Sequence, residues 1–297
     1  MKWKLKDGAE NIEAVTARGI VLDGVLFNQT PSKQSDTVLI AITGIHGNFF
    51  SNPFYFNFGE TLNRHNIHFI YAQACDAFGE IKTRNAQTDG EVTIGSWNER
   101  FADADDDVRS YINWAENAGY KHIILAGHSL GANKVIHYLS AHHDNRVEHF
   151  LLLSPANIRH LTSQVTIYEK SVIQHRIERG RGQEKLPFEL LGWIPCNADT
   201  ASDWVFTDTL NNVHVEQNAD FSQVAQITHS GALLIGTLDR FTYGDPAGFL
   251  ANINNHFQNS SKNKLIYIEN TGHTYQQKEQ ETADKILELI QNWKIHP

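Results

Sequence analysis

The sequence predicts an α/β protein with a mostly parallel central sheet flanked by helices. Short β-rich runs alternate with longer helical patterns along most of the chain, which is typical of a parallel sheet covered on both faces. With 297 residues the chain is long enough to bury one large core. Its composition is ordinary for a soluble globular protein, and it contains no repeat and no low-complexity tract.

Six apolar runs have the length and composition of buried strands. They are TVLIAIT at 37–43, HFIYAQA at 68–74, HIILAG at 122–127, HFLLLS at 149–154, ALLIGT at 232–237 and KLIYIEN at 264–270. Near the N-terminus, the stretch EAVTARGIVLDGVLF predicts an antiparallel hairpin, which we place at the edge of the sheet.

Apolar residues at helical spacing predict helices between these strands. One spans 101–115, one follows Ser129, and one near the C-terminus ends at Trp293. The first begins with an acidic run, which we interpret as a solvated first turn favoured by the helix dipole and not as a metal site. This run consists of Asp103, Asp105, Asp106 and Asp107.

Residues 157–228 interrupt the alternation, because they contain no clean strand and the stretch RIERGRGQEKLPFELLGWIP is loop-like. A structureless loop of that length is unusual, so we expect short helices within it. It lies between two strong strand signals and reads as a helical cap inserted after the sixth strand. We therefore predict a core formed by 1–156 and 229–297, and a cap or lid over 157–228.

Charge and composition exclude several classes of protein. The net charge of −9 argues against a nucleic-acid partner, since such a surface needs a basic footprint. No apolar run is long enough to span a bilayer, and MKWKLKDGAE lacks the apolar core of a secretory signal. Cys75 and Cys196 fit reduced, packed thiols better than a disulfide framework. We expect a cytoplasmic protein without a membrane partner, and leave its oligomeric state open.

The segment Gly127-His128-Ser129-Leu130-Gly131 matches the pattern G-x-S-x-G, with an apolar strand before it and an amphipathic helix after it. A serine presented at the top of a sheet needs a strained turn, and side chains two positions on either side would collide. Glycine removes that collision. We predict that Ser129 is a catalytic nucleophile.

A serine hydroxyl needs a base, and the base needs an acid to hold its tautomer. His273, in IENTGHTY, directly follows the last strand and therefore lies at the same sheet edge as Ser129. Asp239 follows the strand ALLIGT within the segment GTLD. Asp245 is the rival acid, but Asp245-Pro246 reads more naturally as the start of a helix. The favoured order is Ser129, Asp239, His273.

Negative charge on the substrate oxygen requires fixed N–H donors, which form an oxyanion hole. One donor should be the backbone N–H of Leu130. The other should come from TGIHGNFF: Ile45 if Thr43-Gly44 closes the strand, or Asn48 if His46-Gly47 does. We favour Ile45, because the strand then has a normal length.

The candidate substrate-binding residues are His46, His128, Trp193 and Trp204. The cap also carries Phe206 together with polar and charged side chains, so the pocket would be both apolar and polar. Such a pocket suits a bulky, oxygenated ester or lactone. The alternative interpretation is that the aromatic residues form the core of the cap itself.

The segments GHSLGA, GTLD and NTGH, in that order, resemble those of α/β-hydrolase-fold serine hydrolases over nearly the whole chain. The chain is also similar, more weakly, to esterases that open fusarinine-type siderophore esters, in ACDAFGE, DADDDVRSYINW, GRGQEKLP and ADTASDWVFTD. It departs from that group at Thr43, His128 and Leu130. The resemblance implies a serine esterase or lactonase that works through an acyl-enzyme, with no metal and no organic cofactor.

Two other functions use the same sequence features. An acyltransferase would employ the same triad, with an alcohol or amine in place of water. A non-catalytic ligand-binding protein could keep the fold and the triad residues. We favour hydrolysis of a bulky polyfunctional ester or macrocyclic lactone.

Overall fold

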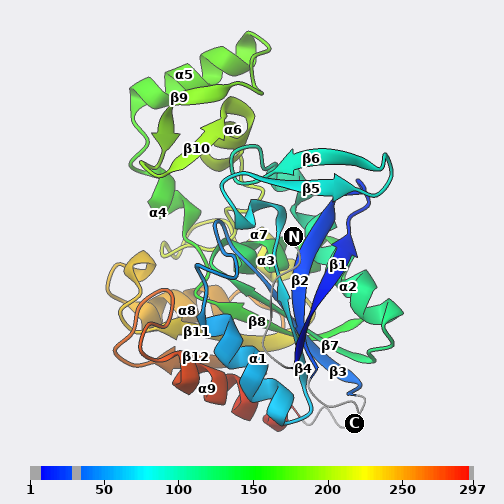
Figure 1. The fold of residues 1–297 in the computed structure, drawn as a ribbon. Helices are drawn as coiled ribbons and strands as arrows, with labels where there is room; N and C mark the ends of the chain where they lie inside the picture. The colour runs from blue at the N-terminus through cyan, green and yellow to red at the C-terminus, as the bar shows by residue number, and fades with distance from the viewer. Residues whose placement is uncertain (1–7, 29–34, 294–297) are drawn as a thin grey trace.

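An eight-stranded sheet runs through the part of the protein that the computed structural model describes, residues 8–28 and 35–293 (Figure 1). Most of MKWKLKDGAE, where we expect no secretory signal, lies outside these residues. The strand order is β1-β2-β4-β3-β7-β8-β11-β12. The strands are β1 Ala9–Val15, β2 Val21–Phe27, β3 Thr37–Ile42, β4 His68–Ala72, β7 His122–His128, β8 Val147–Leu153, β11 Ser230–Gly236 and β12 Lys264–Ile268.

The pairing of the strands confirms the predicted sheet. Strand β2 pairs antiparallel with both β1 and β4, whereas every other neighbouring pair in this sheet is parallel. The N-terminal hairpin therefore lies at one edge, and the six predicted strands form the rest. Parallel strands share one carboxyl edge, so the loops after β3, β7, β11 and β12 meet on one side of the molecule.

Helices cover both faces of the sheet because side chains alternate along each strand. In β3, Val38, Ile40 and Ile42 join one apolar cluster, and Leu39 and Ala41 join the other. The first face is covered by α2 Ala104–Asn117, α3 Leu130–His142 and α8 Pro246–Asn254, and the second by α1 Phe54–Arg64 and α9 Glu279–Asn292. The three predicted helices correspond to α2, α3 and α9.

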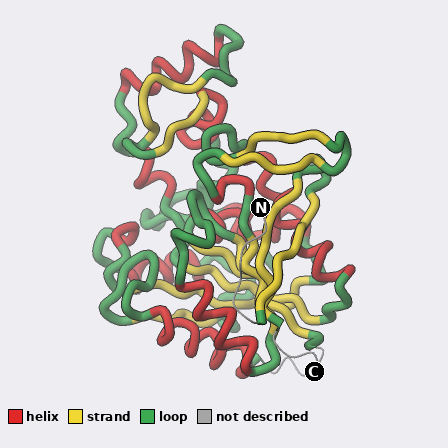
Figure 2. The backbone as a smooth tube through the Cα atoms, viewed as in Figure 1, coloured by secondary structure: helices red, strands yellow, loops and turns green. Residues whose placement is uncertain are grey.

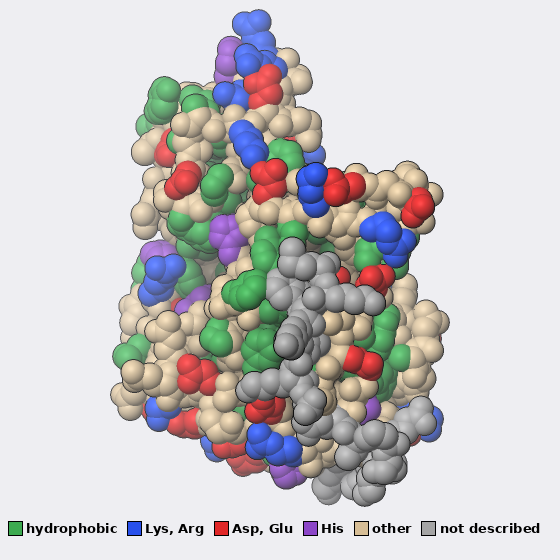
Figure 3. Space-filling view, viewed as in Figure 1, with side chains coloured by type: hydrophobic (Ala, Val, Ile, Leu, Met, Phe, Trp, Pro, Cys, Tyr) green, Lys and Arg blue, Asp and Glu red, His purple; other side chains and the backbone are tan. Residues whose placement is uncertain are grey.

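The surface carries both signs of charge. On the face shown in Figure 3, acidic and basic side chains are interspersed. Of the helices in residues 8–28 and 35–293, none is both long enough and apolar enough to cross a membrane.

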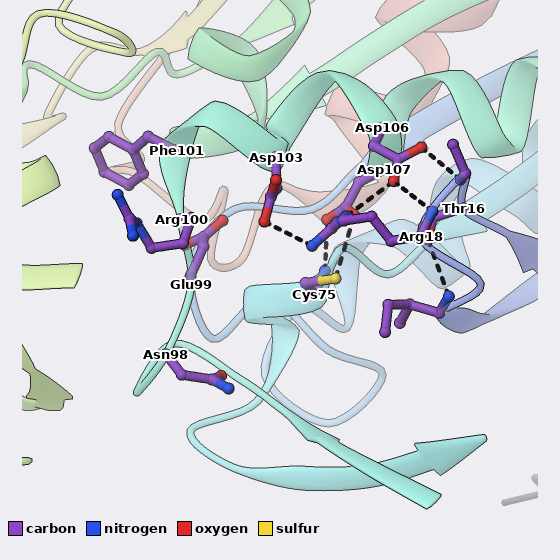
Figure 4. A network of polar contacts seen from close by, with 12 residues as sticks. Thr16, Arg18, Cys75, Asn98, Glu99, Arg100, Phe101, Asp103, Asp106 and Asp107 are labelled. Carbon is purple, nitrogen blue, oxygen red and sulfur yellow. Dashed lines mark hydrogen bonds and ion pairs between the residues drawn. The ribbon is translucent and has the colours of Figure 1, made fainter. Parts of the chain in front are cut away.

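The acidic run at the start of α2 is not the solvated turn that we expected (Figure 4). Asp107 is buried and accepts a hydrogen bond from the backbone N–H of Cys75 at 2.8 Å. Arg18, from the turn between β1 and β2, forms ion pairs with Asp103, Asp106 and Asp107 at 2.7, 2.9 and 3.3 Å. The prediction was wrong because the edge hairpin brings a guanidinium to the helix, which no local pattern encodes.

The predicted insertion contains helices, as expected, and also a hairpin. Its elements are α4 Ile158–Thr162, α5 Ile167–Glu178, β9 Lys185–Leu190, β10 Ile194–Asn197, α6 Ala198–Phe206 and α7 Ser222–Gln226. In Figures 1 and 2, α5, β9, β10 and α6 form a lobe that stands off from the sheet. Helix α7 instead packs against α3, through Val224 in the apolar cluster on that face of the sheet.

The loop-like interpretation of RIERGRGQEKLPFELLGWIP is wrong for its second half, which forms the antiparallel β9–β10 hairpin. Leu186, Phe188 and Leu190 face the apolar cluster of the lobe, while the residues between them are exposed. Those exposed residues include Pro187, which is uncommon inside strands and hides the alternation. A proline is tolerated in β9 because the sheet has only two strands, so each of them is an edge strand.

A second hairpin and three short 3₁₀ helices also fell outside the prediction. The hairpin consists of β5 Ile81–Asn85 and β6 Gly90–Ile94, whose residues are mostly polar and nowhere fully buried. The 3₁₀ helices are η1 Cys75–Ala77, η2 Phe101–Asp103 and η3 Arg240–Thr242. Of these, η1 follows β4 and η3 follows β11, so both lie at the carboxyl edge of the sheet.

Candidate active site

Ser129 occupies a strained turn between β7 and α3. Its φ is 56° and its ψ is −127°, a combination of backbone angles that residues other than glycine rarely adopt. A Cβ atom at Gly127 would lie 2.2 Å from the carbonyl oxygen of Gly131, and one at Gly131 would lie 2.4 Å from that of Ile42. Only glycine fits at either position, which is the steric reason for the pattern around Ser129.

Asp239 and His273 form a hydrogen-bonded pair. Asp239 follows β11 and His273 follows β12, and the Nδ1–H of His273 donates to Oδ2 of Asp239 at 2.8 Å. The second carboxylate oxygen accepts the backbone N–H of Phe241 at 3.0 Å. Burial opposes ionisation of Asp239, but His273 and the N–H of Phe241 outweigh it and keep the pKa of Asp239 below its usual value.

The rival acid, Asp245, has a different task. Its side chain accepts a hydrogen bond from the backbone N–H of Gly248 at 2.8 Å, at the N-terminus of α8. Pro246 occupies the first turn of that helix. Asp245 therefore acts as the N-cap of α8, and its carboxylate is occupied there.

Ser129 and His273 line the same cavity, whose volume is about 130 Å³. The cavity lies at the carboxyl edge of the sheet and is closed in part by side chains from the insertion. Its wall includes Gly44, Ile45, His128, Leu130, Trp193, Trp204, Arg240 and Phe241. The loops that follow β7 and β12, more than a hundred residues apart in sequence, thus meet around one small space.

The two residues proposed as oxyanion donors, Leu130 and Ile45, come from different loops and line the same cavity. Leu130 is the first residue of α3, where an N–H has no acceptor within the helix. Ile45 lines the cavity, whereas the N–H of Asn48 donates to Oγ of Ser51 at 2.9 Å. This geometry supports Ile45 over Asn48. Between the two loops a Cβ at Gly44 would lie 2.9 Å from the Leu130 nitrogen, so glycine is required there as well.

The two histidines that we singled out for substrate binding lie in different surroundings. His128 is buried against His273, and its Nε2–H donates to the carbonyl oxygen of His273 at 2.7 Å. Burial, followed by the neighbouring His273, lowers the pKa of His128 to about 3, so its imidazole is neutral. His46 is not among the described cavity residues; its Nε2 lies 2.7 Å from Oγ of Ser96.

The two tryptophans both reach the cavity. Trp204, on α6, is 2 % exposed and also belongs to the apolar cluster of the insertion. Trp193, in the β9–β10 turn, is 38 % exposed and contacts the ring of His46 edge to face, with centroids 5.4 Å apart. The interpretation of these residues as cap core therefore holds for Trp204, which serves as core and cavity wall at once.

Sequence reasoning missed Arg240 and Phe241, which line the cavity directly after Asp239. The Phe241 ring contacts the His273 ring edge to face, with centroids 4.6 Å apart. Their only sequence signal is adjacency to GTLD at the end of a predicted strand, where loop residues of this fold class commonly contribute to a site.

A second ionic group is centred on Lys134 of α3, and we call Lys134, Asp76 and Glu99 the Lys134 cluster. The ammonium of Lys134 lies 2.8 Å from Oδ1 of Asp76 and 2.6 Å from Oε1 of Glu99. The backbone carbonyl of Asp76 accepts the N–H of His46 at 2.9 Å. The cluster thereby connects the helix that follows Ser129 to the loop that carries Ile45.

Comparison with known proteins agrees with this geometry. A family model described as serine hydrolase matches residues 83–179, a segment that contains Ser129. The fold is similar to Est1E from Butyrivibrio proteoclasticus, with a TM-score of 0.64 and 14% identity over 95% of this chain and 98% of that one. It is also similar to the carboxylesterase CesB from Bacillus subtilis, with a TM-score of 0.55 and 13% identity over 97% and 93%.

A monoacylglycerol lipase from Paleococcus ferrophilus gives a TM-score of 0.59 and 16% identity, over 90% of this chain and 97% of that one. A sequence comparison with curated proteins finds no significant match. The sheet order and these structural relatives define an α/β-hydrolase fold. The family match, over 97 of the 297 residues, supports serine hydrolase activity for a chain of this fold.

Proposed function

We propose that this protein hydrolyses carboxylic esters through Ser129, His273 and Asp239, by way of an acyl-enzyme. The observation that carries the proposal is the hydrogen bond between Nδ1 of His273 and Oδ2 of Asp239, at 2.8 Å. The imidazole of His273 lines the same cavity as Ser129. A base oriented by a buried acid beside a serine on a strained turn is the arrangement that activates a hydroxyl.

The reaction follows from these positions. His273 takes the proton of the Ser129 hydroxyl, and Oγ attacks the ester carbonyl. The N–H groups of Leu130 and Ile45 stabilise the oxyanion. As the ester C–O bond breaks, His273 returns the proton to the departing alcohol. Water, deprotonated by His273, then attacks the acyl group, and the Ser129 oxygen leaves as the acid is released.

In this proposal residues 157–228 act as a cap that shapes the substrate site. Trp193 and Trp204 narrow the cavity beside Ser129, and Trp193 also borders a groove of about 470 Å³. A narrow cavity beside a wider groove of mixed polarity suits a bulky polyfunctional ester or a macrocyclic lactone, because the groove can hold the part of the substrate that the cavity cannot. We expect such compounds to be hydrolysed faster than long-chain triglycerides. The free, buried thiols of Cys75 and Cys196 support a cytoplasmic location.

The test combines active-site labelling with a substrate panel. A fluorophosphonate probe should label the wild-type protein and leave Ser129→Ala unlabelled. Hydrolysis of a panel of esters, lactones, amides and thioesters should fall by a factor of about 10⁴ or more in Ser129→Ala. The matched control is Ser171→Ala, an exposed serine on α5, which should label and turn over like the wild type. Equal labelling of wild type and Ser129→Ala would overturn the proposal.

Product analysis on the same panel distinguishes hydrolysis from transfer. With an added alcohol present, we expect free acid to remain the main product, since water completes the proposed cycle. A predominance of the new ester would assign the triad to acyl transfer instead.

A further inference from the structure

A groove adjoins the cavity that contains Ser129. The two spaces share Leu161, Trp193, Arg240 and Phe241 as wall residues. At about 470 Å³ the groove is large enough for a substantial part of a small substrate. A substrate whose ester carbonyl lies at Ser129 would therefore extend past Arg240, and the polar groups of the groove decide what it can carry.

Two of the polar groups in the groove already have partners. The Glu169 carboxylate accepts hydrogen bonds from the backbone N–H and the hydroxyl of Thr166, both at 2.7 Å, at the N-terminus of α5. His160 Nδ1 lies 2.6 Å from the hydroxyl of Tyr243. Both groups hold the wall of the groove, Glu169 through Oε2 and His160 through Nδ1.

Arg240 differs from these groups. Over residues 8–28 and 35–293 its guanidinium forms no ion pair with a carboxylate, and its environment is the Phe241 ring, 4.9 Å from the guanidinium carbon to the ring centroid. A guanidinium stacked on an aromatic face keeps its N–H donors directed sideways, and those donors match the geometry of a carboxylate. The residue is exposed, so its donors can be reached from the groove.

The same phenyl ring relates Arg240 to the reacting groups. The Phe241 ring neighbours both groups: its centroid lies 4.9 Å from the guanidinium carbon of Arg240 and 4.6 Å from the ring centroid of His273. Because Arg240 and Ser129 line the same small cavity, one small substrate could place an acid group at Arg240 and an ester carbonyl at Ser129.

We propose that Arg240 is a specificity residue that binds a carboxylate of the substrate, so that the preferred substrates are esters carrying a free carboxylate a few bonds from the scissile carbonyl. This inference rests on the proposed esterase function and narrows its substrate class. A planar, bidentate contact between guanidinium and carboxylate is charge-assisted and is lost when either partner is neutral.

The experiment compares two ethyl esters of equal chain length, monoethyl glutarate and ethyl pentanoate, by measuring ethanol release. We expect wild-type kcat/KM to be higher for monoethyl glutarate, and Arg240→Gln to lower the ratio of the two values by about 10- to 100-fold. Arg240→Lys, which keeps the charge without the planar fork, should give an intermediate ratio. Added salt should reduce the wild-type ratio, since the groove is open to solvent.

The matched control is Arg64→Gln, which removes the same charge from the exposed surface of α1, where Arg64 pairs with Glu60. It should leave both rates unchanged. Protection against fluorophosphonate labelling by the two esters supplies a second readout that does not depend on turnover. A wild-type ratio of one or less, or an unchanged ratio in Arg240→Gln, would overturn the role of Arg240. Ser129-dependent hydrolysis of both esters would still support the proposed function in that case.

Discussion

The Asp239–His273 pair and the Lys134 cluster differ in their access to solvent. In the Asp239–His273 pair the carboxylate is fully buried, but the imidazole is 20 % exposed and lines the cavity. In the Lys134 cluster all three side chains are at most 4 % exposed. The imidazole of the first group can be reached from the cavity, whereas the second group is sealed from solvent. We therefore expect the Asp239–His273 pair to serve catalysis and the Lys134 cluster to serve stability, although both groups consist of ionisable side chains.

The surroundings of the carboxylates differ in the same way. The pKa of Asp239 stays below its usual value because one imidazole and one N–H outweigh its burial. In the Lys134 cluster a single ammonium serves two carboxylates, and burial together with Asp76 raises the pKa of Glu99. Burial also disfavours the Lys134 ammonium, but the surrounding carboxylates outweigh it and raise its pKa. Each member of the cluster therefore depends on the others to remain buried.

The largest effect is expected from Asp239→Asn. An amide cannot hold the Nδ1–H tautomer of His273, so kcat should fall by about 10⁴-fold. The melting temperature should change much less, because the side-chain shape is retained. Ester turnover and thermal unfolding of the same preparation measure both quantities. Asp245→Asn, at the N-cap of α8, is the matched control and should keep wild-type kcat. If Asp239→Asn stayed within tenfold of wild type, the acid would have to be assigned elsewhere.

Lys134→Met should instead have its main effect on stability. It leaves Asp76 and Glu99 buried without their counter-charge, so the free energy of unfolding should decrease by about 3–5 kcal/mol. Urea unfolding measures the loss, and adding Glu99→Gln to Lys134→Met should restore part of it. Lys121→Met removes an exposed lysine paired with Asp36 and should leave the urea midpoint unchanged. A urea midpoint for Lys134→Met equal to that of wild type would show that the cluster does not stabilise the fold.

Gly44→Ala tests the loop that the Lys134 cluster holds against α3. The new Cβ would lie 2.8 Å from the carbonyl oxygen of His128 and 2.9 Å from the nitrogen of Leu130, so the loop has to move away from α3. If that loop supplies an oxyanion donor, kcat should fall by about 10²- to 10³-fold with a smaller change in KM. Steady-state kinetics on one ester decides this, and a change confined to KM would argue against the donor.

The strands, their parallel order and the residues of the Asp239–His273 pair were predictable because each depends on local sequence. Apolar runs such as HIILAG encode buried strands, and the carboxyl edge of a parallel sheet collects the loops that follow them. Glycine at 127 and 131 is demanded by the turn itself, so the position of Ser129 follows from sterics.

The Lys134 cluster and the groove were not predictable, since they depend on contacts between distant segments. Lys134 reads as a solvated residue of an amphipathic helix, and only the fold brings Asp76 and Glu99 to it. The β9–β10 hairpin escaped prediction because exposed polar residues and Pro187 mask its alternation. Asp107 is a similar case, because its partner Arg18 comes from the edge hairpin. Tertiary contacts override local pattern at each of these places.

The smallest effect concerns His128, which contacts the Asp239–His273 pair but is sealed like the Lys134 cluster. Its pKa of about 3 in the folded protein lies below the value of about 6.5 expected after unfolding. Below pH 6.5 the unfolded chain therefore binds a proton that the folded chain does not, and stability falls as the pH drops toward 3. Between pH 7.5 and pH 5 this loss amounts to about 2 kcal/mol.

His128→Gln should abolish that part of the pH dependence, since an amide can still donate to the carbonyl of His273 and does not titrate. Urea unfolding at pH 7.5 and pH 5 measures the difference, with the exposed His65→Gln as the control that keeps the wild-type dependence. The other buried histidines remain in both proteins, so only the contribution of His128 is removed. Identical pH profiles for wild type and His128→Gln would mean that folding does not shift the pKa of His128, so that His128 is protonated in the folded protein at pH 5. The imidazolium would then lie against His273 and would change the electrostatics of the proposed base, so this measurement also tests the charge state on which the role of His273 depends.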